Sequence, residues 1–104
     1  MPFRWRMDTE TTGASFWRKE LSGGAVAVAI VNRNDNVTLP AGSVNLNLLE
    51  AGFSSDTRVA VRDLFHRENL GWHTFNFKTT RAIPPHGVVL LRLAYSPVYA
   101  AAEL

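Results

Sequence analysis

The sequence predicts an all-β protein, an antiparallel β-sandwich of the Greek-key type with roughly seven to eight short strands. Three observations predict it. Apolar and polar residues alternate over several short stretches, turn residues separate these stretches at short intervals, and helical periodicity is almost absent. At 104 residues the chain has the length of one domain with a single core, and its 46% hydrophobic content is that of an ordinary globular protein.

Two stretches show a period of two residues. Val44, Leu46 and Leu48 alternate with asparagines, so one face of this stretch is apolar and the other is polar. Phe75 and Phe77 alternate with polar residues in the same way. Both stretches are therefore expected to be half-buried strands.

Three further stretches are apolar on both faces or nearly so, and these are residues 25–31, 59–65 and 88–93. In residues 25–31, large side chains alternate with alanines. This pattern predicts a central strand with one face in the core and something lying close against the other.

Glycine, proline and asparagine mark the predicted turns, which are residues 22–24, 32–36, 40–43, 67–71 and 84–87. Residues 22–24 and 67–71 are each expected to close a hairpin, with Gly71 at a positive φ. The prolines of residues 84–87 predict an extended approach and a sharp turn into the last strand.

The predicted sandwich covers residues 16–95. Residues 1–15 are polar and lack periodicity, which is typical of an inter-domain linker or a vector-derived extension. Residues 96–104 form a C-terminal tail, in which Ser96 as N-cap and Pro97 at the first helical position predict one or two helical turns.

Composition excludes several classes of function. The chain has no cysteine, so disulfides and thiolate metal sites are excluded. Its 11 basic and 9 acidic residues are mixed along the chain, which argues against a nucleic-acid surface or an anionic-membrane surface. The longest apolar run, residues 25–31, is shorter than the about 18 residues that a membrane span needs. No signal peptide is expected, because no apolar segment follows the charged N-terminus.

The carboxylates do not predict a catalytic pair. Asp63 and Glu68 flank a predicted hairpin and Asp56 precedes it, but all three stand near arginines in the sequence. Solvated ion pairs explain this pattern better than two acids that face each other across a glycosidase groove. No catalytic residue is predicted.

Metal and cofactor sites are not predicted either. The spacing of His66, His73 and His86 matches no compact zinc-ligand pattern. No serine lies in a nucleophile elbow, and the glycines form neither a phosphate loop nor a dinucleotide fingerprint.

Aromatic residues mixed with basic ones remain as binding candidates, in residues 3–6 and 16–19. The favoured interpretation is that Phe16 is a core residue whose edges are covered by arginine stems. The functional alternative is that Trp5, Trp17 or Trp72 stacks on a sugar ring. Asn36, in the triplet Asn-Val-Thr, is the candidate acceptor for N-glycosylation.

The order of the segments is informative in itself. Residues 16–33 read FWRKELSGGAVAVAIVNR, and residues 61–65, 69–71 and 84–93 read VRDLF, NLG and PPHGVVLLRL. In this order and spacing they closely resemble the C-terminal domain of α-galactosidases of glycoside hydrolase family 27. That domain has a W-x-(K/R)-x-L-S-G-G hairpin, a V-R-D-L-W strand and a closing P-x-H-G-V-x-L-L-R-L strand. Phe65 here replaces the usual tryptophan.

The resemblance implies a non-catalytic sandwich that packs against a separate (β/α)₈ barrel, since both catalytic aspartates of the family lie in the barrel. No residue here matches a catalytic or galactose-binding position. The implied parent hydrolyses terminal α-D-galactosides, is lysosomal or secreted, and is often a homodimer. The resemblance does not separate an α-galactosidase parent from an α-N-acetylgalactosaminidase parent.

Three hypotheses follow from these observations. The first is a structural module that packs against the barrel and stabilises it. The second is a carbohydrate-binding module that uses exposed tryptophans, and the third is a free-standing protein-interaction domain.

Overall fold

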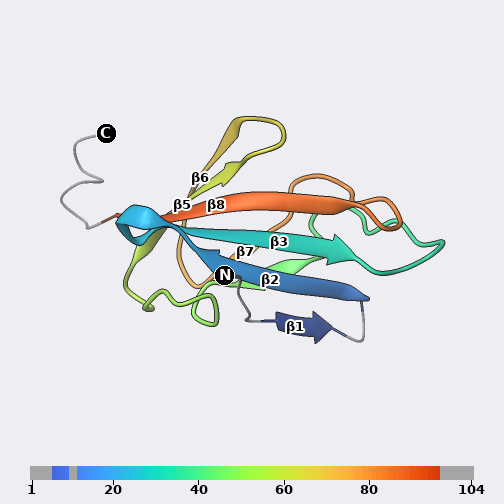
Figure 1. The fold of residues 1–104 in the computed structure, drawn as a ribbon, viewed down its shortest axis with the longest axis horizontal. Coiled ribbons are helices and arrows are strands. Elements are labelled where there is room, and N and C mark those ends of the chain that lie inside the picture. The colour runs from blue at the N-terminus through green and yellow to red at the C-terminus, as the bar shows by residue number, and fades with distance from the viewer. Residues whose placement is uncertain (1–5, 10–11, 97–104) are drawn as a thin grey trace.

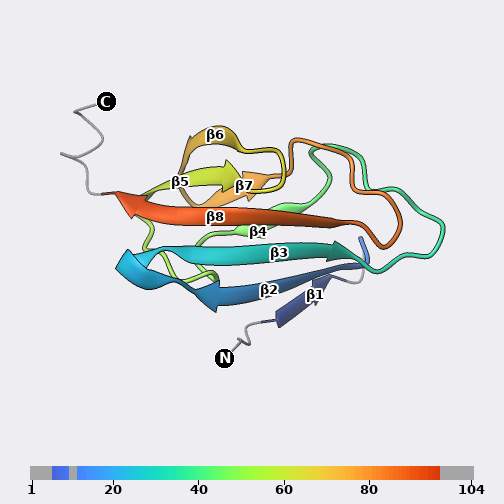
Figure 2. The ribbon, with the colours of Figure 1, turned by 45° about the horizontal axis from the view of Figure 1, so that its top comes forward.

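The computed structural model describes residues 6–9 and 12–96 of the chain. Within these ranges all paired strands are antiparallel. One sheet has six strands in the order β1-β2-β3-β8-β5-β6, and β4 pairs with β7 in a second sheet (Figures 1 and 2). The elements are β1 (Arg6–Thr9), β2 (Ala14–Glu20), the 3-10 turn η1 (Ser22–Gly24), β3 (Val26–Asn32), β4 (Asn45–Asn47), β5 (Arg58–Asp63), β6 (Glu68–His73), β7 (Asn76–Lys78) and β8 (Val88–Ser96).

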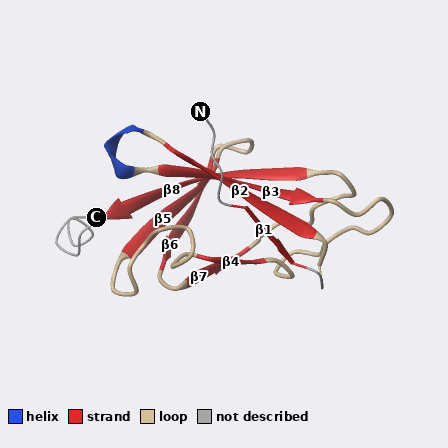
Figure 3. Ribbon diagram, turned by 60° about the horizontal axis from the view of Figure 1, so that its bottom comes forward, coloured by secondary structure: helices blue, strands red, loops and turns tan. Residues whose placement is uncertain are grey.

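The two sheets form two layers, with β4 and β7 against one face of the larger sheet (Figure 3). The chain crosses between the layers four times between β3 and β8 because β4 and β7 belong to the small sheet. On its return, β8 enters the large sheet between β3 and β5, which are not consecutive in the chain. The predicted all-β antiparallel sandwich is confirmed.

The core fills the space between the layers. Phe16, Val28 and Ile30 from the large sheet are fully buried, and so is Leu46 from β4. Because burial of apolar surface is the main term that favours folding, these side chains fix which face of each strand turns inward.

β3 shows the predicted alternation. Val26, Val28 and Ile30 are buried in the core, whereas Ala27 and Ala29 on the opposite face are half-buried. β3 lies between β2 and β8, so the prediction of a central strand is confirmed.

The N-terminal limit of the predicted sandwich needs revision in one respect. Arg6–Thr9 form β1 and pair with β2, and Ala14 is fully buried at the start of β2. The sheet therefore begins before residue 16, because pairing of backbone N–H and C=O groups requires no apolar alternation in β1. Whether this segment joins another domain stays a prediction. The helical turn predicted after Ser96 lies outside the described residues.

The hairpin predicted at residues 67–71 is present, but its turn comes earlier. β5 ends at Asp63 and β6 begins at Glu68, so residues 64–67 form the turn, with Arg67 at φ 54°. Gly71 has the predicted positive φ of 89°, but it lies inside β6, opposite an irregularity in the register of β5. A bulge, and not the turn, needs this glycine.

The prediction for Phe75 is wrong. Its φ of 67° places it in the turn between β6 and β7, and its side chain is 52% exposed. The backbone explains this position, because the Phe75 carbonyl accepts a hydrogen bond from the N–H of Leu48 at 2.9 Å. Only Phe77 enters the core from this stretch, as predicted.

The polar loop predicted at residues 32–36 also begins later, because Asn32 is the last residue of β3 and is fully buried. Its amide nitrogen Nδ2 donates to the carbonyl oxygens of Val37, Ile83 and Pro84 at 2.8, 3.0 and 3.1 Å. Its Oδ1 accepts from the backbone N–H of Asn34 at 2.9 Å. This side chain therefore joins β3 to two loops that are about 50 residues apart in the sequence.

The turn at residues 84–87 is confirmed. The N–H of Gly87 donates to the carbonyl of Pro84 at 2.8 Å, and His86 has φ 62°. A Cβ at Gly87 would stand 2.9 Å from the Pro84 carbonyl oxygen, so this position needs glycine.

Candidate docking face

The face of the large sheet that points away from the small sheet carries rows of apolar residues at its centre. Cross-strand pairing places Trp17, Ala29 and Leu90 in one row across β2, β3 and β8. Val31 and Val88 form the next row. We call this surface the outer face. It consists of the outward-facing residues of β2, β3, β8, β5 and β6 that are not fully buried, which are Trp17, Lys19, Ala27, Ala29, Val31, Arg58, Ala60, Arg62, Asn69, Trp72, Val88, Leu90, Arg92 and Ala94.

Two large apolar side chains on this face are exposed to solvent. Trp17 and Val88 are each 42% exposed, whereas the alanines between them are half-buried. The solvent-facing side of an antiparallel sheet is ordinarily polar, and a contiguous apolar surface commonly marks an interaction site. The small side chains of β3 leave room for a partner to approach the backbone closely.

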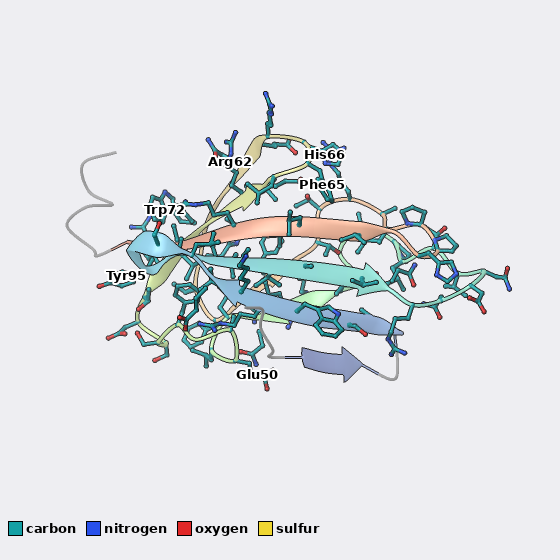
Figure 4. The ribbon with its side chains drawn as sticks, viewed as in Figure 1. Glu50, Arg62, Phe65, His66, Trp72 and Tyr95 are labelled. Atoms are coloured by element: carbon teal, nitrogen blue, oxygen red, sulfur yellow. The ribbon has the colours of Figure 1, made fainter. Side chains whose placement is uncertain are left out.

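A hollow lies at the β5–β6 end of the outer face. It holds about 310 Å³ and is lined by Arg62, Arg92, Trp72 and small neighbours that include Gly71. The guanidinium of Arg62 donates to Oδ1 of Asn69 at 2.7 Å. In Figure 4, Arg62 and Trp72 both lie near strands β5 and β6.

Two of the three predicted sugar-stacking tryptophans lie on the outer face, and Trp5 is outside the described residues. Trp17 is on β2 and Trp72 on β6, four strand spacings or roughly 19 Å apart in the sheet. The two rings therefore do not belong to one site. The guanidinium carbon of Arg58 stands 5.3 Å from the centre of the Trp72 ring.

The predicted glycosylation acceptor, Asn36, is exposed in the loop that follows β3. Its neighbours Val37 and Thr38 are exposed as well. This geometry leaves the triplet accessible, and glycosylation stays a prediction.

Each histidine has a local partner of its own. His66 Nδ1 is 3.0 Å from Asp63, His73 Nε2 is 2.8 Å from the carbonyl oxygen of Leu70, and His86 Nε2 is 2.9 Å from Asp35. Across the described ranges, no three potential ligands among His, Asp and Glu are gathered in one place. The same ranges contain no helix that could cross a membrane.

The carboxylates differ from the predicted solvated pairs with neighbouring arginines. Asp63 and Glu68 are opposite each other across the hairpin, but they serve different partners. Asp63 is only 3% exposed and accepts from the backbone N–H groups of Phe65 and His66, each at 3.0 Å. Glu68 is exposed and pairs with Arg81 at 3.1 Å. Asp56 accepts from the hydroxyl of Ser54.

Asp63 therefore holds the turn between β5 and β6. Its burial favours the neutral form and by itself would raise the pKa. The hydrogen bonds from the His66 backbone and imidazole and from the Phe65 backbone outweigh burial and lower the pKa of this carboxyl below its ordinary value of 3.8. The sequence did not reveal this role, because an acid after an apolar strand is equally typical of a solvated turn.

Asp63→Asn is expected to reduce the free energy of unfolding at pH 7 by about 1–2 kcal/mol, since hydrogen bonds to a charged acceptor are weakened. Because the pKa of Asp63 is lower in the folded than in the unfolded chain, its ionised form stabilises the fold at pH values above the unfolded-state pKa. This stabilisation is lost as the pH falls through the folded-state pKa and the carboxylate becomes protonated. The difference between wild type and variant should therefore shrink below about pH 4. Urea unfolding from pH 7 to pH 3 measures it.

Glu50→Gln is the matched control, because it also removes one carboxylate. Glu50 is exposed, and in Figure 4 it lies on the opposite side of the molecule from His66, the partner of Asp63. The difference in free energy of unfolding between wild type and Glu50→Gln should not shrink as the pH falls. An Asp63→Asn variant whose stability parallels that of wild type at every pH would contradict the role of the carboxylate.

Comparison with known proteins supports the resemblance seen in the sequence. Residues 11–93 match the family described as "Alpha galactosidase C-terminal beta sandwich domain". A protein of Dictyostelium discoideum described as "Probable alpha-galactosidase" is 34% identical over 77 residues, which are 74% of this chain and 19% of that protein. The chain thus spans about a fifth of the length of that relative.

Two solved structures have the same fold. α-Galactosidase I of Mortierella vinacea superposes with a TM-score of 0.68 at 20% identity, over 88% of this chain and 24% of that one. A GH27 β-L-arabinopyranosidase of Geobacillus stearothermophilus gives the same TM-score and identity, over 88% of this chain and 19% of that one. With its family match over residues 11–93, this chain belongs to the family of α-galactosidase C-terminal β-sandwich domains.

Proposed function

We propose that this domain is a non-catalytic module that packs the outer face of its large sheet against a catalytic (β/α)₈ barrel and stabilises it. The proposed parent is an α-galactosidase-type glycoside hydrolase that acts on terminal α-D-galactosides. The observation that carries the proposal is the apolar outer face on a domain that corresponds to only 19% of its Dictyostelium relative.

The chemistry of the described residues supports a non-catalytic role. Asp63 is fully engaged in the turn, and Glu68 is paired with Arg81. Hydrolysis of a glycoside needs two carboxyl groups that face the scissile bond from opposite sides. The solved neighbours also carry different activity names, an α-galactosidase and a β-L-arabinopyranosidase, which is consistent with specificity that lies outside the sandwich.

The shape of the outer face supports docking against another domain. Trp17, Val88 and Leu90 would be covered. Because Trp17 and Val88 are already more than half buried, each would contribute only part of the about 1.5–3 kcal/mol that full burial of a large apolar side chain supplies. Interfaces between domains of one chain cover about 600–1,500 Å². An extended sheet face suits an interface of this kind better than it suits a small ligand.

Ala29→Arg in the full-length parent tests this proposal. Ala29 lies at the centre of the outer face, so a long charged side chain would hold the barrel away. We expect the melting temperature of the parent to fall by about 2 °C or more. One kcal/mol shifts a domain of about 150–250 residues by about 2–4 °C and a larger protein by less, so a fall of this size corresponds to a loss of more than about 1 kcal/mol. Differential scanning calorimetry of the parent and of the 104-residue chain measures the effect.

Leu49→Arg is the control, because it adds the same side chain at an exposed apolar position in the turn after β4. In the 104-residue chain alone, both variants should unfold within about 0.5 kcal/mol of wild type, as surface substitutions ordinarily do. Equal melting temperatures of the two variants in the parent would overturn the proposal. A reading frame that encodes no barrel would overturn it as well.

Two finer expectations stay predictions. A carbohydrate-binding role of Trp17 or Trp72 requires a saturable change in indole fluorescence when galactose or melibiose is added, and the packing role predicts none. A homodimer of the parent would show as twice the monomer mass in light scattering.

A further inference from the structure

From β2 across to β6, the charges on the outer face are all of one sign. Among its residues on β2, β3, β5, β6 and β8, four are cationic and none carries a carboxylate. The four are Lys19, Arg58, Arg62 and Arg92. The chain as a whole is nearly balanced, with 11 basic and 9 acidic residues, so the outer face departs from the average composition.

Two of these cations stand directly opposite each other. Arg62 on β5 and Arg92 on β8 are cross-strand partners, and both line the hollow at the β5–β6 end of the outer face. Like charges in opposite positions of an antiparallel pair repel each other and destabilise the sheet. The repulsion is removed when an anion lies between the two guanidinium groups.

The surroundings of this pair hold its geometry in place. Asn69, the cross-strand partner of Arg62 on β6, accepts a hydrogen bond from its guanidinium at 2.7 Å. Arg58 lies over the ring of Trp72, which lines the same hollow. Tryptophan and arginine are the residues most often found at the energetic centre of an interface.

We propose that Arg62 and Arg92 bind carboxylate side chains on the surface of the barrel that docks against the outer face. This inference rests on the proposed function. A carboxylate matches the planar fork of a guanidinium group with two parallel hydrogen bonds, which an ammonium group does not reproduce. The apolar rows of the outer face supply the contact area, and the arginine pair selects an acidic partner surface and fixes its orientation.

A protein carboxylate fits this site better than a free anion does. The hollow opens onto a sheet face whose neighbouring positions are Ala27, Ala60 and Ala94, so a second surface can close over it. Water would otherwise remain in the hollow and screen the charges, and interactions between exposed groups are weak under those conditions.

The test uses a single cysteine as a reporter of docking, since the 104-residue chain has none. Ala29→Cys is placed in the full-length parent and in the 104-residue chain, and the rate of maleimide labelling at this residue is followed by mass spectrometry. The ratio of the two rates reports how far the outer face is covered and corrects for the intrinsic reactivity of the thiol.

We expect labelling in the parent to be at least about tenfold slower than in the chain alone, which corresponds to docking by about 1.4 kcal/mol. We call this slowing of labelling at residue 29 the protection. Arg92→Glu should remove most of the protection, and so should a rise in NaCl from 50 to 500 mM, which screens the charges. Arg92→Lys should restore only part of it. Lys78→Glu, which makes the same charge change on β7 of the small sheet, should leave the protection intact.

The outcomes separate the two proposals. Equal labelling rates in the parent and in the chain alone would overturn the docking proposal itself. Strong protection that is insensitive to Arg92→Glu and to salt would leave docking standing and overturn the role of the arginine pair. Saturable binding of inorganic phosphate or glucuronate to the 104-residue chain, abolished by Arg92→Glu while the protection in the parent is unchanged, would assign the site to a free anion instead.

Discussion

Replacing Asn32 by aspartate is expected to lower the free energy of unfolding by about 3–5 kcal/mol, the range found when a buried charge is left without a compensating partner. The Nδ2 of Asn32 donates to three carbonyl oxygens between 2.8 and 3.1 Å away. In the aspartate variant an anionic oxygen would face these three oxygens, and the site is fully buried. Urea unfolding at pH 7 measures the change.

Asn45→Asp is the matched control, because Asn45 is exposed on β4 and the covalent change is the same. It should alter stability by less than about 0.5 kcal/mol. Asn32→Ala should fall between the two, since it removes the donors without adding a charge. An Asn32→Asp variant as stable as Asn45→Asp would show that the carbonyls of the two loops do not depend on this amide.

The second large effect concerns Phe16, which is fully buried on the inner face of β2. Phe16→Ala removes a large side chain from the space between the sheets and is expected to cost about 3–5 kcal/mol, from lost burial and from the cavity left behind. Because small domains are marginally stable, the variant should be substantially unfolded at a urea concentration that leaves the wild-type chain folded.

The neighbouring Trp17 provides the contrast, since it lies on the same strand and faces the other way. In the 104-residue chain, Trp17→Ala should cost less than half as much as Phe16→Ala, although tryptophan is the larger residue. Equal losses from the two substitutions would mean that the assignment of inner and outer faces of β2 is wrong.

The alternation of side chains in the sequence predicted the faces of β3 and β4 because that signal is local. Side chains of a strand alternate between its two faces, so the positions of apolar residues in the sequence suffice to assign the buried face. Leu46 and Ile30 lie inside as expected. The family resemblance added the order of the segments, which alternation alone does not determine.

The features that escaped prediction depend on contacts between distant segments or on backbone geometry. β1 has no apolar pattern and is defined by its pairing with β2. The left-handed conformation of Phe75 depends on a hydrogen bond from Leu48, 27 positions away. Period-two patterns place Arg62 and Arg92 on outward positions, but only the register between β5 and β8 brings them opposite each other.

The position of β8 has a consequence for the synthesis of the protein. β8 comprises the last described residues, yet it lies between β3 and β5 and pairs with both. While the chain emerges from the ribosome, the segment with β1, β2 and β3 and the segment with β5 and β6 have no common neighbour, and each keeps an unpaired edge. The sheet can be completed only after residues 88–96 leave the exit tunnel, so this interval is when a growing chain is most exposed to chaperones and to aggregation.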